Sequence, residues 1–159
     1  MLFIALLVVV GWMLSTIKAE DDDSFCPMAA LAGKWELKDD TRHEYFIFEW
    51  NKDKKYLEMT IEILVGPQNR SPSRGLVCYD AKTEKLYLFM YSDDGKFHIG
   101  REVKRLGKDV YLELTLFNNP NGDKLYVCYS FSENLFVVKA SLELDNWVDL
   151  GSIELRRIE

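Results

Sequence analysis

The chain has 159 residues, of which 48% are apolar and 29% charged, and 26 Asp and Glu outnumber 20 Lys and Arg for a formal charge of −6. This composition fits one globular domain with an acidic surface and excludes a disordered chain and a repeat array. Nucleic acid is not an expected partner, because the basic residues are scattered among acids and form no positive stripe for phosphates.

Residues 1–19 are expected to be a secretory signal peptide. An apolar run over residues 2–14 precedes the small residue Ala19, and the run is shorter than the roughly 20 residues that a membrane-spanning helix needs. We therefore expect cleavage after Ala19, a secreted extracellular protein, and no membrane contact of the mature chain. An uncleaved anchor is the alternative, because no Lys or Arg precedes the apolar run.

Residues 20–32 are expected to form an acidic tail followed by a short helix. Without its first 19 residues the chain would have 140 residues and a formal charge of −7. The acidic run 20–23 is typical of a solvated tail. Segment 26–32 fits a short helix, since Pro27 suits a first helical position and Gly33 a stop. We expect this helix to plug one end of the domain.

Residues 33–159 show the alternation of apolar and polar side chains that predicts β-strands. Every second residue from Leu57 to Val65 is apolar, for example, while Glu58 and Glu62 lie between them. One face of such a strand is expected to be buried and the other exposed to solvent. Ten strands are predicted, at 33–38, 44–51, 56–65, 74–79, 86–91, 97–104, 110–117, 125–130, 135–144 and 150–157.

The connections between these strands predict an all-β fold, a ten-stranded antiparallel up-and-down barrel. Each connection has hairpin length and turn-forming residues, and none is long enough for the crossover helix that a parallel pair requires. A meander of ten strands leaves two long edges unpaired unless it closes. We therefore expect one barrel domain over residues 33–159, with the short N-terminal helix at one end.

The even number of strands brings the start of the first and the end of the last to the same end of the barrel, which we expect the helix to close. The two longest connections contain Pro and Gly and belong to the opposite end, where ligands usually enter. We expect an open mouth framed by residues 39–43, 66–73, 92–96, 118–124 and 145–149.

The two ends of the barrel sequence carry a pair of features known from one superfamily. Gly33-Lys34-Trp35 resembles the Gly-x-Trp signature of lipocalins and the wider calycin superfamily, whose last strand carries a basic residue that packs across that Trp. Arg157 shares a face with Leu155 and is the expected partner through cation–π stacking. The resemblance implies structural roles for Gly33, Trp35 and Arg157, and a carrier of a small hydrophobic ligand. Ten strands exceed the eight of lipocalins and match fatty-acid-binding proteins and nitrobindin-like haem barrels.

The face predicted to point inward supplies a candidate ligand-binding lining. Arg101 falls there by alternation with Phe97 and Ile99, and an interior guanidinium would hold an anionic head group such as a carboxylate. The alternative is that Arg101 pairs with a buried acid or reaches solvent. Methionines on this face would make the lining adaptable or simply pack the core. The expected lining comprises Met59, Ile61, Ile63, Leu88, Met90, Phe97, Ile99, Arg101, Leu112, Leu114, Phe136 and Val138.

The sequence offers no metal, cofactor or catalytic centre. His98 alternates away from its apolar neighbours and is expected to face solvent, and His43 falls in a connection, so the two form no zinc spacing. No Gly-x-Ser-x-Gly, His-Glu-x-x-His or phosphate-binding glycine loop occurs. We therefore expect a protein that is not an enzyme. A haem barrel using His98 or His43 is a weaker alternative.

One disulfide is expected among the three cysteines of a secreted chain. Cys78 and Cys128 belong to strands four apart in the barrel, too distant for the ~5.5–6 Å that separates the Cα atoms of a bridge. Cys26 is therefore the expected partner of one of them, and the choice between the two stays open. Asn69 begins an Asn-Arg-Ser sequence in the longest mouth loop and is a candidate glycosylation site, with Pro72 following.

The leading hypothesis is a secreted, lipocalin-like carrier that binds a small hydrophobic molecule in the barrel by burial of apolar surface. The alternative from another class is a secreted interaction protein, whose barrel is filled by its own side chains and whose loops, including Trp147, bind a macromolecule. The oligomeric state stays open.

Overall fold

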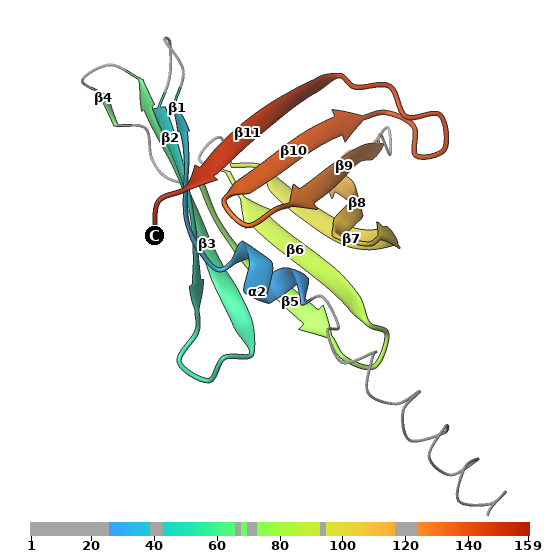
Figure 1. The fold of residues 1–159 in the computed structure, drawn as a ribbon, viewed down its shortest axis with the longest axis horizontal. Helices are drawn as coiled ribbons and strands as arrows, with labels where there is room; N and C mark the ends of the chain where they lie inside the picture. The colour runs from blue at the N-terminus through green and yellow to red at the C-terminus, as the bar shows by residue number, and fades with distance from the viewer. Residues whose placement is uncertain (1–25, 39–42, 66–67, 70–72, 93–94, 117–123) are drawn as a thin grey trace, which may run out of the picture.

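The computed structural model describes residues 26–38, 43–65, 68–69, 73–92, 95–116 and 124–159. They form one short helix and a single antiparallel sheet (Figure 1). The elements are α2 (Pro27–Leu31), β1 (Gly33–Lys38), β2 (His43–Trp50), β3 (Tyr56–Val65), β4 (Gln68–Asn69), β5 (Ser73–Asp80), β6 (Lys85–Tyr91), β7 (Phe97–Leu106), β8 (Asp109–Leu116), β9 (Lys124–Phe131), β10 (Leu135–Ser141) and β11 (Gly151–Arg157).

The sheet closes into a barrel of ten strands. Its order is β2-β1-β11-β10-β9-β8-β7-β6-β5-β3-β4, and the additional pairing of β2 with β3 joins the two sides. Strand β4 pairs only with the last residues of β3 and lies outside the ring. The predicted fold class, an all-β antiparallel barrel of ten strands with a short N-terminal helix, is confirmed.

Each predicted strand is present, with ends that differ by at most three residues. The largest difference is at β10, which ends at Ser141 because its hydroxyl organises the turn that follows. Ser141 Oγ accepts hydrogen bonds from the backbone N–H of Glu143 and of Val148, both at 3.2 Å. The N–H of Leu150 then returns to the carbonyl of Ala140 at 2.9 Å. Strand β4 was not predicted, since two residues show no alternation.

Strand β7 contains an irregularity that changes which side chains face inward. Its register against β8 shifts between Glu102 and Lys104, so that Glu102 lies opposite Leu112 and Arg105 opposite Val110. Residues on both sides of this bulge therefore reach the interior at unequal spacing. Glu102 is buried there, where its carboxylate accepts hydrogen bonds from Arg105 Nε at 2.8 Å and Nη2 at 2.7 Å.

The hydrophobic core fills the end of the barrel at which β1 begins and β11 ends, which we call the closed end. Its members are contributed by every strand of the ring except β7, and by α2, and most are less than 4% exposed. The cluster consists of Met28, Leu31, Trp35, Leu37, Phe48, Leu57, Met59, Val77, Leu86, Leu88, Val110, Leu112, Phe131, Phe136 and Leu155.

Candidate functional site

The closed end is held by Trp35 and Arg157, which lie directly opposite each other on β1 and β11. The guanidinium carbon of Arg157 lies 4.4 Å from the centroid of the Trp35 ring. This is the cation–π contact that the sequence predicted. Trp35 is fully buried, and its indole Nε1–H donates to the carbonyl of Leu31 at 2.8 Å.

Arg157 also fastens the helix to the barrel. Its two terminal nitrogens donate to the carbonyls of Ala30, at 2.8 Å, and Ala32, at 3.0 Å. Both carbonyls lie at the C-terminal end of α2, a helix of only five residues, and have no hydrogen-bond partner within it. Met28 and Leu31 of α2 are buried against the core. One arginine therefore satisfies the helix end, covers the Trp35 ring and closes the barrel.

Gly33 is required at the junction between α2 and β1. Its φ of +129° lies in a region that favours glycine, and a Cβ built there would lie 2.6 Å from the carbonyl oxygen of Glu159. The close approach lets Lys34 exchange backbone hydrogen bonds with Ile158 and Glu159 beyond the end of β11. The Gly-x-Trp pattern thus has a physical reason in this chain.

Farther from the closed end most inward-facing apolar side chains are only half-buried, although Leu37 and Glu44 are buried there, and we call this part of the barrel the open half. Pairing in register places them on the same face as the core. They point inward and still retain accessible surface, so the inner face is covered less completely here than at the closed end. These residues are Phe46, Ile61, Ile63, Met90, Leu114, Val138 and Ile153.

Tyr129 of β9 is a polar residue on the inner face of the barrel. Desolvation in the protein interior raises the pKa of its phenol to about 12. Its ring packs edge-on against Phe136, with centroids 5.1 Å apart, and it lies opposite Val110 and Val138 on the inner face. The side chain nevertheless keeps accessible surface. Tyr129 is therefore an inward-facing polar side chain at the border between the packed core and the open half.

Nine of the twelve residues expected to line the cavity lie on the inner face. Five are the half-buried side chains of the open half, Ile61, Ile63, Met90, Leu114 and Val138. The other four are no more than 3% exposed and belong to the packed core: Met59, Leu88, Leu112 and Phe136.

The expected inward positions of Phe97, Ile99 and Arg101 are wrong, because all three lie on the outer wall. Ile99 pairs with Phe89 and Thr115, while the neighbouring residue Gly100 pairs with the inner residues Leu88 and Leu114. The physical reason is crowding at Gly100. A Cβ there would lie 2.7 Å from a methyl carbon of Leu114 and 3.0 Å from the Cβ of Leu88, so only the residue without a side chain fits inside.

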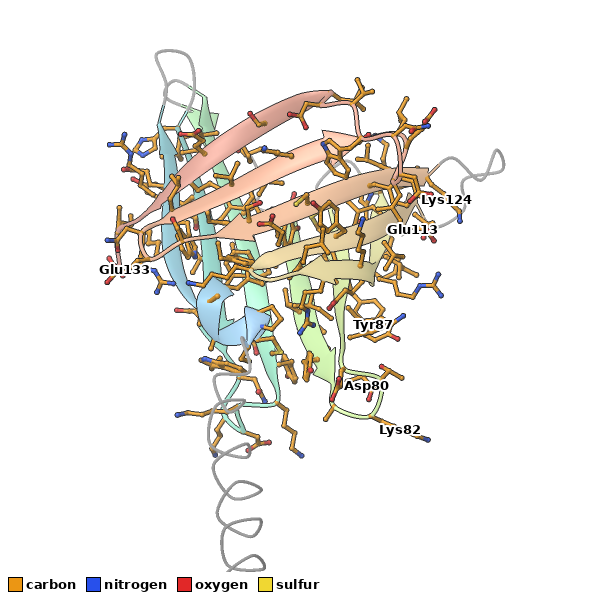
Figure 2. The ribbon with its side chains drawn as sticks, turned by 45° about the vertical axis from the view of Figure 1, so that its right-hand side comes forward. Asp80, Lys82, Tyr87, Glu113, Lys124 and Glu133 are labelled. Carbon is orange, nitrogen blue, oxygen red and sulfur yellow. The ribbon has the colours of Figure 1, made fainter. Side chains whose placement is uncertain are left out.

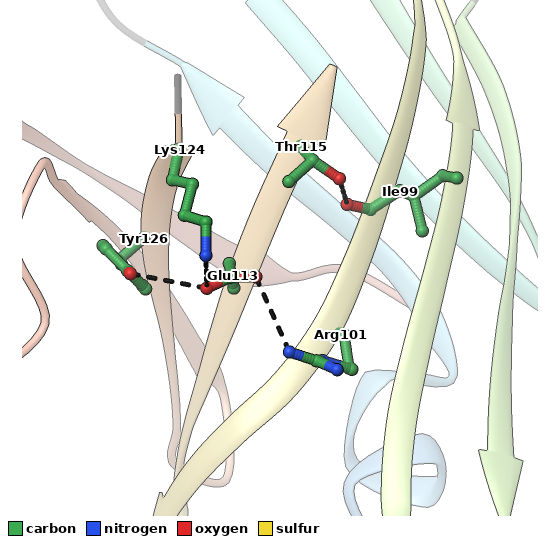
Figure 3. Close-up of polar contacts among 6 residues, drawn as sticks. All are labelled: Ile99, Arg101, Glu113, Thr115, Lys124 and Tyr126. Atoms are coloured by element: carbon green, nitrogen blue, oxygen red, sulfur yellow. Dashed lines mark hydrogen bonds and ion pairs between the residues drawn. The ribbon is translucent and has the colours of Figure 1, made fainter. Parts of the chain in front are cut away.

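On the outer wall Arg101 takes part in a cluster of charged side chains around Glu113. Figure 2 shows Glu113 and Tyr87 along the same side of the barrel. The Glu113 carboxylate accepts hydrogen bonds from Lys124 Nζ at 2.9 Å and Tyr126 Oη at 3.4 Å, and Arg101 Nη2 lies 3.7 Å from it (Figure 3). The Arg101 side chain is 57% exposed. It is therefore not available to hold an anionic group inside the barrel.

The two histidines also occupy positions that differ from those expected. His98 lies opposite Met90 and Leu116, on the inner face, and not toward solvent. His43 is the first residue of β2, and its Nε2 lies 2.5 Å from Glu36 Oε1. No group of three His, Cys, Asp or Glu within the described ranges could hold a metal ion.

Alternation along single strands also missed Glu44 and Tyr129, two further polar residues of the interior. Glu44 is 7% exposed and lies opposite Leu37 and Ile63 on the inner face near the mouth. Tyr129 was missed because β9 has apolar or aromatic residues on both faces. Only the pairing of neighbouring strands identifies which side of β9 faces inward.

The expected disulfide is absent, since all three cysteines are free. Cys78 pairs with Tyr56 and Tyr87 and therefore lies on the outer wall, as does Cys128, which pairs with Tyr111. Cys26 precedes α2, which packs into the core from inside the closed end. Cys26 itself is exposed and forms no bond with either thiol, one of which was expected to be its partner.

Trp147, expected as a loop residue that binds a macromolecule, folds back onto the barrel. Its ring packs edge-on against Tyr111 with centroids 5.5 Å apart, and its indole N–H donates to Asp149. Trp147 and Tyr111 line a small hollow on the outer wall together with Cys128, and burial raises the pKa of the Cys128 thiol.

The expected signal peptide over residues 1–19, the expected acidic tail and the side chain of Asn69 lie outside the described part of the chain. Within the described part, no helix combines the length and apolar character that a bilayer crossing requires.

Comparisons with known proteins assign no family. No family model matches the sequence, and no curated protein matches it.

Proposed function

We propose that this chain is a secreted, lipocalin-like carrier that binds a small hydrophobic molecule in the open half of the barrel. The observation that carries the proposal is the set of apolar side chains that face the barrel interior and stay half-buried, among them Ile61, Met90 and Val138. Such side chains favour an apolar ligand, because contact with it removes apolar surface from water.

The polar side chains of the interior would orient this ligand. Glu44 and His98 face inward near the mouth, and Tyr129 lies deeper. A ligand with its apolar part against Ile61 and Val138 would leave its polar end close to the mouth. The Gly33, Trp35 and Arg157 arrangement at the closed end supports the lipocalin-like description, because it joins a helix to a barrel as the superfamily resemblance implies.

Uptake of fluorescent apolar probes tests the proposal, with one neutral retinoid and one fatty acid. We expect the wild-type protein to raise the fluorescence of at least one probe with saturation. Val138→Trp should abolish uptake by filling the open half. Val137→Trp is the matched control, because Val137 is also half-buried but faces the outer wall. It should bind like the wild type.

The outcomes separate cleanly. Failure of the wild-type protein to bind any apolar probe would falsify the carrier proposal. Equal loss of uptake in both tryptophan variants would place the probe outside the barrel interior. Circular dichroism of each variant checks that the barrel is retained.

A further inference from the structure

A buried carboxylate lies on the inner wall of the barrel near the mouth. Glu44 is the second residue of β2, and alternation along β2 places it on the same face as Phe46 and Phe48, the latter a member of the core. Its partners on the neighbouring strands are Leu37 of β1 and Ile63 of β3. Glu44 is only 7% exposed. An acid therefore lies inside the barrel with apolar side chains on either side.

The basic side chains of the inner wall lie at the other end. Arg105 is opposite the core residue Val110 and is paired with Glu102 at 2.7 Å. Arg157 is engaged with the carbonyls of the helix at the closed end. Among the described strands of the open half, none has Lys or Arg on its inner face. The formal charge that these strands contribute to the open half is therefore negative.

A carboxylate in this position selects the head group of a ligand. Glu44 already takes part in an interaction within the chain, and its two oxygens offer about four acceptor positions in all, so a ligand can add a further donor. Hydrogen bonds between an ionised acceptor and an ionised donor are the strong ones. An ammonium group is therefore favoured beside Glu44, and the carboxylate of a fatty acid is repelled by it.

The charge of the whole chain acts in the same direction. The formal charge is −6 at pH 7, and a net negative protein attracts cations and slows the approach of anions. The anionic head group expected from an inward-facing Arg101 has no support, because Arg101 lies on the outer wall. Both the local and the overall charge thus favour a cationic ligand.

We propose that the ligand of the open half is an apolar amine, whose ammonium group binds Glu44 and whose hydrocarbon part lies against the half-buried apolar side chains. This inference rests on the carrier function proposed above and names the chemical class of its ligand. A charge-assisted hydrogen bond holds the head group, and removal of apolar surface from water holds the hydrocarbon part. Ile63 is half-buried and lies opposite Glu44, so it contacts the ligand where the two parts join.

Isothermal titration calorimetry of the purified protein with decylamine, decanol and decanoate tests the proposal. The three probes share an alkyl chain and differ in the head group, which is cationic, neutral or anionic at neutral pH. Decylamine should bind about 10- to 100-fold more tightly than decanol, since this is the effect of one hydrogen bond to a charged group. Decanoate should bind more weakly than both. This comparison uses the wild-type protein alone, so it does not depend on the folding of a variant.

Glu44→Gln removes the charge and keeps the size of the side chain. It should lower the affinity for decylamine by about 10- to 100-fold and leave that for decanol within about twofold. Glu62→Gln is the matched control, because it removes the same charge from the adjacent strand β3, where Glu62 is half-buried on the outer wall opposite Tyr45. It should bind decylamine like the wild type. Circular dichroism checks that both variants retain the barrel.

Each contrary outcome has a distinct meaning. Decylamine that binds no more tightly than decanol overturns the inference and leaves the carrier proposal standing. A preference for the amine that survives Glu44→Gln, or that Glu62→Gln removes to the same extent, overturns the assignment of the head group to Glu44. Absence of binding by all three probes and by the neutral retinoid overturns the carrier proposal together with the inference.

Discussion

The two ends of the barrel are built from the same alternating strands, yet they differ in how their inner side chains are used. At the closed end Trp35, Phe136 and Leu155 are at most 1% exposed, and α2 is tied down by Arg157. In the open half Ile61 and Val138 point into the same interior and remain half-buried.

The difference shows that a closed sheet does not by itself produce a filled core. The closed end is filled for two reasons. Met28 and Leu31 of the helix contribute side chains from outside the sheet, and aromatic rings of the strands pack around Phe136. The open half receives no comparable cover from the described residues. Stability is therefore expected to come mainly from one end and binding from the other.

The largest expected effect comes from Trp35→Ala. It removes a fully buried indole, its hydrogen bond to Leu31 and its contact with Arg157. We expect the free energy of unfolding to fall by about 3–5 kcal/mol. Urea denaturation followed by circular dichroism measures it.

Ile61→Ala is the comparison in the open half, where the side chain is already half-buried. It should cost clearly less than Trp35→Ala, on the order of 1–2 kcal/mol. Equal losses for the two variants would contradict the division of the barrel into a packed end and an open half.

A smaller effect is expected for Gly33→Ala. The added Cβ meets the Glu159 carbonyl at 2.6 Å in a backbone conformation with φ of +129°, so the variant should lose about 2 kcal/mol. Gly151→Ala is the control, because a Cβ there meets nothing within 4 Å. Thermal unfolding of both should show a lowered midpoint for Gly33→Ala only.

Tyr129→Phe tests the boundary between the two regions through pH. The folded protein holds the phenol proton up to a pKa of about 12, against 10.0 for an ordinary tyrosine. The unfolded chain loses that proton first, so wild-type stability should fall as pH rises from about 10 to 12. Tyr129→Phe should remove this part of the fall and leave stability near neutral pH almost unchanged. Urea denaturation midpoints of both proteins, measured from about pH 10 to pH 12, test this prediction.

The smallest expected effect belongs to the outer wall. The hydrogen bond from Lys124 and the nearby Arg101 lower the pKa of Glu113 below 4.5. A lowered folded pKa gives stability that is present above the unfolded value and lost as pH falls through the folded value. Glu113→Gln should therefore lower the urea midpoint slightly at neutral pH and not in acid. High salt should shrink the difference, since the pair is exposed; a difference that salt leaves unchanged would contradict the assignment.

Much of the fold could be predicted because hairpin connections and alternation are local properties. The boundaries of β3 agree in full, at Tyr56 and Val65, and the contact between Trp35 and Arg157 followed from strand parity combined with the superfamily resemblance. The same local pattern predicted the wrong inward face for β7. Phe97 and Ile99 alternate like core residues, and the side chains that compete with them for the interior belong to β6 and β8.

The candidate site was predictable in part for the same reason. Ile61, Met90 and Val138 were found from alternation, whereas His98 and Glu44 were not, since a polar residue inside a barrel breaks the pattern used to find the inner face. The expected disulfide depended on where three separate elements lie across the wall. Sequence spacing carries no information about that.

The sequence by itself determined the ten strands of the ring, their antiparallel order, the closure of the sheet and the end that the helix covers, because turn residues and period-two patterning act within a few residues of each other. Only the tertiary structure decided which face of β7 turns inward, where Arg101 goes and how far the core fills the barrel. Those outcomes depend on the space between neighbouring strands, and at Gly100 that space, bounded by Leu88 and Leu114, admits no side chain.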